Sequence, residues 1–235
     1  LFCIPTLFND YEKTIRSTQL LLNQCEKNNI DYKIFIVSNI EDELFSKWDT
    51  GVPEVEKMVS GELYNVPKAL NLPIDKYDAD YYVLFQDDMF INDDMWIDKF
   101  IEIYKNKDLN CGVLGLRPHT HRNIYCKPVS GKLPYQIEEL LWTDGVMFFS
   151  TKFFNEIGKF DERYIGDCES QEFCYRLKDV GYKNYRVYLE HRHEASGFNN
   201  KVSDQEGFMK KVNTSRELFK SKWDEWQDKI VKMEE

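Results

Sequence analysis

The segment "YYVLFQDDMFINDDMWI" (residues 81–97) passes from an apolar stretch directly into two adjacent carboxylates, Asp87 and Asp88. The residues just before them, 80–86, are mostly aromatic and aliphatic, which predicts a buried β-strand. Two carboxylates at the end of a buried strand cost free energy unless a positive group meets them. The segment therefore predicts a positively charged partner at the end of this strand.

The acids further along the segment have a separate explanation. Residues 92–94 (Asn-Asp-Asp) precede an amphipathic stretch and are placed to cap a helix over about residues 93–105. That cap does not require Asp87 or Asp88. Adjacent carboxylates at a strand end are typical ligands of Mg²⁺ or Mn²⁺, and both ions also bind phosphate oxygens. We therefore expect a divalent cation at this position.

Composition limits the classes of protein that fit. The chain has 235 residues, of which 42% are hydrophobic and 15% aromatic, so a sizeable core is expected. A net charge of −10 disfavours a nucleic-acid binder and means that an anionic ligand requires a bridging cation. The six cysteines lack metal-site spacing, which predicts reduced and mostly buried thiols. The sequence has no apolar run of about 20 residues and no signal segment. We expect a cytoplasmic protein; the alternatives are a protein peripheral to a membrane and a domain of a longer polypeptide.

Hydrophobic periodicity predicts a single α/β domain in which strands and helices alternate through the first half. Strands are expected at residues 1–6, 32–38, 80–86, 111–116, 144–150 and, as the last strand, 185–189. Helices are expected at residues 10–28, 65–74, 93–105, 151–158, 169–180 and 203–233. Residues 122–133 predict an exposed hairpin turning at 130–131, and residues 41–60 carry no clear pattern. The order strand, helix, strand predicts parallel pairs with right-handed crossovers.

In an open sheet of this kind, ligands bind beyond the carboxyl ends of the strands. Three predicted strand ends carry polar or turn-forming residues, at 5–6, 38–39 and 86–88. We expect these ends to converge on one site.

Seven segments, in order along the chain, resemble the conserved blocks of inverting GT-A glycosyltransferases of the family-2 type. They are "CIPTLFND", "NVPKALNLPI", "YYVLFQDDMFI", "DGVMFFSTKFFNEIGKFDERY", "ESQEFCYRLKDVGY", "HRHEASG" and "LFKSKW". The resemblance implies the GT-A fold, a Rossmann-like mixed sheet flanked by helices. It also implies a nucleotide-binding half at about 1–90, an acceptor half at about 91–200 and a helical tail at 203–235. The implied substrates are a nucleoside-diphosphate sugar, with a UDP-sugar as first choice, and a hydroxyl acceptor.

The resemblance also implies roles for individual residues. Asp88 matches the last acid of the metal-binding D-x-D motif, whose first acid is Gln86 here, and His193 fits the late metal-binding histidine. These two residues would hold Mn²⁺ or Mg²⁺; the alternative for His193 is a surface histidine. The donor-binding positions implied are Pro5, Thr6, Phe8, Ser38, Asn39, Asn65, Asn71, Gln86 and Asp87.

The family places its catalytic base at a position occupied here by Ser170. Nearby acids are Glu169, the first choice as base, Asp167, the second, and Glu172. The alternative for Glu169 is a favourable charge at a helix N-terminus.

The resemblance further places Trp142, Asp144 and Gly145 near the sugar and the acceptor. Their alternatives are a core tryptophan and a turn. Asp161 is expected to hold a turn.

Two other functions stay open. Ser38 and Ser170 stand where the family usually has acids, which favours a non-catalytic module that binds nucleotide-sugars. Asp87 and Asp88 also suit a metal-dependent phosphohydrolase or nucleotidyltransferase. The sequence lacks the basic, glycine-rich loop with which a nucleotidyltransferase cradles a triphosphate.

Overall fold

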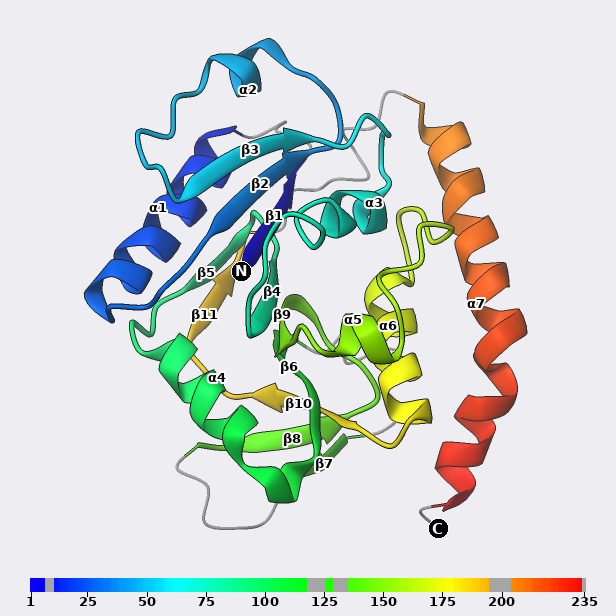
Figure 1. The fold of residues 1–235 in the computed structure, drawn as a ribbon. Coiled ribbons are helices and arrows are strands. Elements are labelled where there is room, and N and C mark those ends of the chain that lie inside the picture. Colours follow the sequence, from blue (N-terminus) through cyan, green and yellow to red (C-terminus); the bar gives the residue numbers. More distant parts are fainter. Residues whose placement is uncertain (7–10, 118–125, 129–134, 195–203, 234–235) are drawn as a thin grey trace.

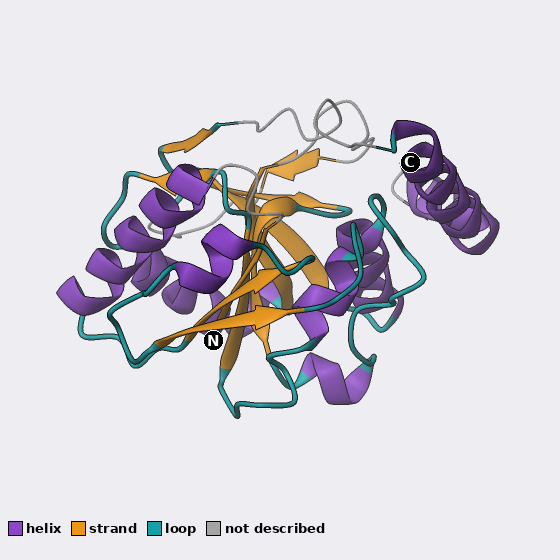
Figure 2. Ribbon diagram, turned by 90° about the horizontal axis from the view of Figure 1, so that it is seen from above, coloured by secondary structure: helices purple, strands orange, loops and turns teal. Residues whose placement is uncertain are grey.

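A mixed β-sheet with helices on both faces forms the centre of the protein (Figures 1 and 2). The computed structural model describes residues 1–6, 11–117, 126–128, 135–194 and 204–233. The strands in these ranges are β1 (Phe2–Thr6), β2 (Ile34–Ser38), β3 (Val55–Val59), β4 (Tyr81–Phe85), β5 (Met89–Ile91), β6 (Cys111–Arg117), β7 (Cys126–Pro128), β8 (Ile137–Leu140), β9 (Asp144–Ser150), β10 (Lys183–Val187) and β11 (His191–His193). The helices are α1 (Tyr11–Lys27), α2 (Glu43–Lys47), α3 (Val66–Asn71), α4 (Trp96–Lys105), α5 (Phe153–Glu156), α6 (Glu169–Asp179) and α7 (Gln205–Met233), with a 3-10 turn at Lys107–Leu109.

The strand order across the described sheet is β3-β2-β1-β4-β9-β6-β10-β8-β7. Strands β1 to β4 are parallel to one another, and β9 runs antiparallel to both β4 and β6. Strands β5 and β11 form a separate two-stranded sheet beside the end of β4. Because parallel strands run in one direction, the carboxyl ends of β1, β2 and β4 meet at the same edge of the sheet.

The central strands are buried on both faces, which explains why their sequences are continuously apolar. Successive side chains alternate between the two faces: Val83 and Phe85 pack with α1 and α4, whereas Tyr82 and Leu84 pack with α3, α5 and α6. Figure 2 shows these helices as layers on either side of the sheet. The carboxyl end of β4 therefore emerges from the most deeply buried part of the molecule.

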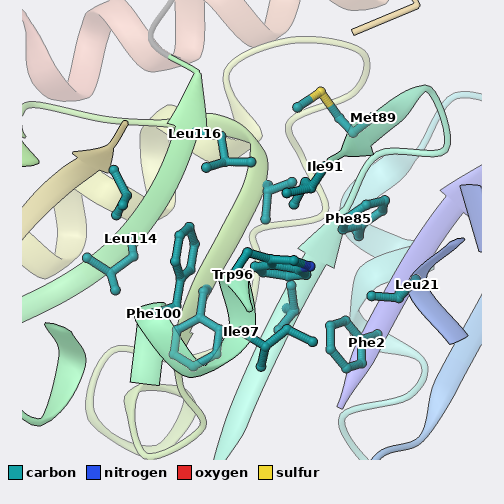
Figure 3. Close-up of a cluster of buried hydrophobic side chains, with 14 of the residues drawn as sticks. Phe2, Leu21, Phe85, Met89, Ile91, Trp96, Ile97, Phe100, Leu114 and Leu116 are labelled. Atoms are coloured by element: carbon teal, nitrogen blue, oxygen red, sulfur yellow. The ribbon is translucent and has the colours of Figure 1, made fainter. Parts of the chain in front are cut away.

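Trp96, at the start of α4, is at the centre of the core on the α1 and α4 side. Its ring lies close to Phe2, Phe85 and Phe100 (Figure 3), with ring centroids 5.3–6.3 Å from that of Trp96. The indole Nε1 donates a hydrogen bond to Gln24 Oε1 at 2.9 Å, so its one polar atom is satisfied. Gln24 Nε2 in turn donates to the carbonyl of Ile91 at 2.7 Å, which links α1 to β5.

Most of the predicted elements are confirmed, with differences mainly in the second half. The prediction that residues 185–189 form the last strand is wrong, because β11 follows and pairs with β5. Residues 41–60, left without assignment, contain α2 and β3. The predicted hairpin contains β7, an edge strand. It pairs with β8, and the sequence did not predict β8. The turn predicted at 130–131 lies outside the described residues. The 203–233 prediction corresponds to the single helix α7.

Two expectations concern location and cysteine chemistry. No helix in the described ranges is both long enough and apolar enough to span a membrane. Five cysteines of the described part are buried, and none of them is in a disulfide there: Cys3, Cys25, Cys111, Cys168 and Cys174. Burial raises the pKa of several of these thiols, that of Cys3 to about 12, so they are expected to be poor nucleophiles.

Replacing Trp96 by alanine is expected to lower the free energy of unfolding by about 3–5 kcal/mol, because it leaves a cavity among aromatic rings and removes the hydrogen bond of Gln24. Urea denaturation followed by circular dichroism measures this loss. Met95→Ala is the matched control, because Met95 is 46% exposed and immediately precedes Trp96. Equal losses in the two variants would contradict the assignment of Trp96 to the core.

Candidate active site

The turn after β4 is fixed by backbone hydrogen bonds on both sides. The amide of Gln86 donates to the carbonyl of Gly145 at 2.9 Å, and the amide of Met89 donates to the carbonyl of Gln86 at 3.1 Å. Gly145 has a positive φ of 76°, a conformation that favours glycine. This geometry directs Gln86, Asp87 and Asp88 to different surroundings.

Asp88 and His193 are the first pair of predicted residues that the fold brings together. Strand β11 pairs with β5 so that His193 is opposite Met89, and the amide of Glu194 donates to the carbonyl of Asp88 at 2.9 Å. As a result, Nε2 of His193 lies 3.2 Å from Oδ2 of Asp88, and the Asp88 residue is 7% exposed. A carboxylate and an imidazole at this separation could both coordinate one divalent ion.

The donor set at this site fits an ion that also binds substrate. Among the described residues, no group of three or more His, Cys, Asp or Glu side chains is placed to hold a metal. Mg²⁺ in phosphate-binding sites is commonly held by one or two carboxylates, with the remaining positions taken by phosphate oxygens and water. Asp88 and His193 would supply a carboxylate and an imidazole to such a site.

Asp87 has a different environment from its neighbour. Its Oδ2 accepts hydrogen bonds from the hydroxyls of Thr6, at 2.5 Å, and Thr14, at 3.1 Å. Burial raises the pKa of Asp87 to about 6, and the two hydroxyls oppose that rise by stabilising the carboxylate. Through these bonds Asp87 connects the end of β4 to β1 and to α1.

The other predicted donor-binding residues at the strand ends are mostly buried. The amide of Asn39 donates to the carbonyl of Thr6 at 3.1 Å, which joins the ends of β1 and β2 as predicted. The Asn39 side chain donates to Ser60 Oγ and to the carbonyl of Asn65, while Ser38 Oγ donates to the carbonyl of Ile40. Pro5 is partly buried in β1. Phe8 lies outside the described residues.

The structure gives Asn65 and Asn71 structural contacts instead of an open position at the donor site. Asn65 Oδ1 caps α3 by accepting from the amide of Lys68, and its Nδ2 donates to the carbonyl of Glu162. Asn71 Nδ2 donates to the carbonyl of Phe160 and to Glu162 Oε1, and its Oδ1 accepts from the amide of Phe160. Both amides hold the 160–162 segment against α3, and their predicted contact with the donor stays a prediction.

A second group of predicted residues lines a cavity of about 570 Å³. The predicted residues on its wall are Gln86, Trp142, Asp144, Asp167, Glu169 and Ser170. They come from the end of β4, the segment entering β9, and the loop and first turn of α6. Because Gln86 lines the cavity and Asp88 faces His193, the turn after β4 connects the cavity with the Asp88–His193 pair.

Glu169 is the most chemically distinctive residue in this cavity. The residue is partly buried, and its Oε2 is buried with no hydrogen-bond partner among the described residues. Burial raises the pKa of Glu169 to about 7, its own backbone amide opposes that rise, and the charges of Asp167 and Asp144 add to it. A carboxyl group with a pKa near neutrality is suited to act as a general base.

Glu172 has the opposite environment and does not line this cavity. It is 0% exposed, and its two oxygens accept hydrogen bonds at 2.8 Å from Arg176 Nε and Lys222 Nζ. Arg176 also donates to the backbone carbonyls of Ile157 and Lys159. The prediction of Glu172 as a third candidate base is therefore corrected: this acid joins α6 to α7.

Asp161 confirms the predicted turn. Its Oδ1 accepts from the backbone amide of Arg163, and the amide of Tyr164 donates to the carbonyl of Asp161.

Sequence reasoning missed several residues near the site. Lys13 is 8% exposed, and its Nζ donates to the carbonyl of Glu194 at 3.0 Å, directly after His193. Its charge acts on Asp87, so Lys13 supplies a positive group of the kind expected at the end of β4. The helix α7 adds Phe208, Met209, Val212 and Arg216 to the cavity wall. The spacing 208, 212, 216 places these residues on one face of a helix, a signal that was present in the sequence.

No protein-family profile matches the sequence, and no curated protein matches it either. Solved structures do resemble it. The catalytic domain of Drosophila β1,4-galactosyltransferase 7, in complex with xylobiose, aligns at TM-score 0.58 and 14% identity over 91% of this chain and 77% of that one. A mannosyltransferase from Pyrobaculum calidifontis, in complex with GDP-Man and Mn²⁺, aligns at TM-score 0.58 and 11% identity over 78% of this chain and 52% of that one.

A mutant of the Drosophila enzyme, in complex with manganese, UDP-Gal and xylobiose, aligns at TM-score 0.56 and 15% identity over 91% of this chain and 78% of that one. These likenesses show the fold. The expected GT-A architecture, a mixed sheet flanked by helices in a single domain, is confirmed.

Glu169→Gln is expected to stabilise the protein at alkaline pH. The folded protein holds the Glu169 proton more tightly than the unfolded chain does, so wild-type stability falls as pH rises from about 4.5 to about 7. The variant avoids that loss and should gain roughly 1–3 kcal/mol at pH 8 and almost nothing at pH 4, since one pKa unit corresponds to about 1.4 kcal/mol. Urea denaturation across this pH range measures the gain. Glu217→Gln, an exposed change on α7, is the control; a gain independent of pH would contradict the raised pKa.

Proposed function

We propose that the protein is a metal-dependent glycosyltransferase. It transfers a sugar, with inversion, from a nucleoside-diphosphate sugar to a hydroxyl acceptor, and a UDP-sugar is the first donor to test. The observation that carries this proposal is the Asp88–His193 pair, joined by the turn after β4 to a cavity lined by Glu169. The likeness to transferases solved with Mn²⁺ and with UDP-Gal or GDP-Man supports it.

On the donor side, the protein has to hold a diphosphate despite its own net charge of −10. Asp88 and His193 would hold Mn²⁺ or Mg²⁺, which neutralises negative charge on the diphosphate when it is bound. Lys13 adds a positive charge beside His193. The ends of β1 and β2, at Thr6 and Asn39, would border the nucleoside.

On the acceptor side, inversion requires a base that removes the proton of the acceptor hydroxyl as its oxygen attacks the anomeric carbon. Glu169 lines the cavity, and its carboxylate would accept this proton in the role that Ser170 cannot fill. Asp167 is a weaker candidate, because its Oδ2 already accepts from Arg216 Nε at 2.6 Å. Trp142 and Gln86 line the same cavity and would contact the transferred sugar.

A non-catalytic module that binds nucleotide-sugars is the second candidate function. The serines at positions 38 and 170, where acids are usual in the family it resembles, favour this alternative. Donor binding that requires Mn²⁺, without transfer or hydrolysis across a panel of donors and acceptors, would support the module over the enzyme.

Removing either side chain of the predicted metal pair is expected to weaken Mn²⁺-dependent donor binding strongly. A thermal-shift panel of nucleoside diphosphates and their sugars, with and without Mn²⁺, first identifies the ligand. Calorimetric titration of the Asp88→Ala and His193→Ala variants should then show at least a tenfold loss of affinity. Asp78→Ala is the control, because Asp78 is exposed before β4 at the opposite edge of the sheet. Unchanged affinity in both site variants would remove the pair from the donor site.

Glu169→Gln is expected to lower kcat by about 10²–10⁴-fold while donor affinity stays within a factor of two or three, because a lost base affects the transition state more than ground-state binding. Steady-state kinetics with the donor identified by the panel measures the effect. Glu217→Gln on α7 should retain wild-type kcat. A Glu169→Gln variant with wild-type kcat would transfer the role of base to Asp167.

A further inference from the structure

The loop that leads into α6 has an unusual backbone. Gly166 has φ of +77°, and Cys168, a residue with a side chain, has φ of +72°. Residues other than glycine adopt this region at an energetic cost, and such conformations persist only where surrounding contacts hold them. The next residue after this loop is Glu169, the proposed base. The position of its carboxylate therefore depends on what holds the loop.

Helix α7 contacts three successive residues of this loop. Ser215, 1% exposed, accepts a hydrogen bond from the amide of Ile165 at 2.7 Å and lies 3.1 Å from its carbonyl. The Phe208 ring lies so near Gly166 that a Cβ there would come within 2.7 Å of it. Arg216 Nε donates to Asp167 Oδ2 at 2.6 Å. Asp167 Oδ1 accepts from the amide of Cys168 at 2.9 Å, which carries the contact to the strained residue.

Acidic side chains outnumber basic ones among the described residues that line the cavity around Glu169. The cavity wall presents two further carboxylates, Asp144 from β9 and Asp167 from the loop, together with the thiol of Cys168. Among the described residues that line this cavity, Arg216 of α7 is the only cation. Both Asp167 and Asp144 act to raise the pKa of Glu169. A cation on Asp167 offsets part of that effect, because opposite charges favour the ionised form of a nearby acid.

We propose that Arg216 is a positioning residue for Glu169: its ion pair with Asp167 holds the loop before α6 in place and neutralises the charge of Asp167 beside Glu169. This inference rests on the proposed function in assigning Glu169 the role of base. It extends that function by making the C-terminal helix part of the catalytic centre. Arg216 itself acts through Asp167 and is not assigned a contact with substrate.

Carboxyl-detected ¹³C NMR titration measures the pKa of Glu169 directly and does not require activity. The Glu169→Gln spectrum identifies its resonance. Arg216→Met should raise the pKa of Glu169 by about half a unit or more, because Asp167 then loses its counter-charge. Arg216→Lys, which keeps the positive charge, should restore most of the wild-type value. Lys210→Met is the matched control, because it removes an exposed cation from the same helix and should leave the pKa unchanged.

The Asp167→Asn variant provides a second test, which stays informative if Arg216→Met does not fold. Asp167→Asn should lower the pKa of Glu169, and the double variant Asp167→Asn, Arg216→Met should lie at or below the wild-type value. For the transferase reaction, the acidic limb of the kcat profile should shift to higher pH in Arg216→Met. An unshifted Glu169 pKa in both folded single variants would overturn the inference even if transfer is observed. A shifted pKa in a protein without transfer or hydrolysis would support the coupling and reject the proposed enzyme.

Discussion

The burial of two adjacent carboxylates at the end of β4 is the constraint on which the site depends. Each acid is compensated by a different part of the chain: Asp87 by the hydroxyls of Thr6 and Thr14, and Asp88 by the imidazole of His193. These contacts connect β4 to β1, to α1 and to β11. Without such partners the two charges would not be tolerated at a strand end of this depth. The same interactions that make the fold possible therefore also assemble the candidate metal site.

The cavity beside this site contains a second costly group. Glu169 has a pKa raised mainly by burial, with a further contribution from Asp167 and Asp144. A buried, partly unsatisfied carboxyl group lowers stability, and catalytic centres commonly retain such groups because their reactivity requires them. The ion pairs of Arg216 with Asp167 and of Lys222 with Glu172 attach α7 to α6 on either side of Glu169. The C-terminal helix thus stabilises the part of the molecule where strain and buried charge are concentrated.

The sequence departs from the pattern of the family it resembles at three positions, Ser170, Gln86 and Ser38, where that family has acids. Ser170 stands where the family it resembles has its base, and the preceding residue, Glu169, lines the cavity and has a pKa raised by burial. Gln86 replaces the first acid of the metal motif and lines the cavity instead of joining Asp88. Ser38 is buried and bonded to a backbone carbonyl, so an acid there would need a new partner. The protein therefore has the same fold as the aligned glycosyltransferase structures, but its acidic side chains lie at other positions than the family pattern places them.

The sequence by itself determined the elements with strong periodicity and the convergence of the ends of β1, β2 and β4. These follow from apolar runs and from strand direction, whereas the pairing of Asp88 with His193 was implied only by the family resemblance. It did not determine β5, β8 or β11, because strands of three or four residues carry too little periodicity to be distinguished from loops. Only the tertiary structure decided how the acids of α6 differ in their surroundings. Glu169 and Glu172 are one helical turn apart and chemically alike, and their difference arises because Lys222 and Arg176 reach one of them and not the other.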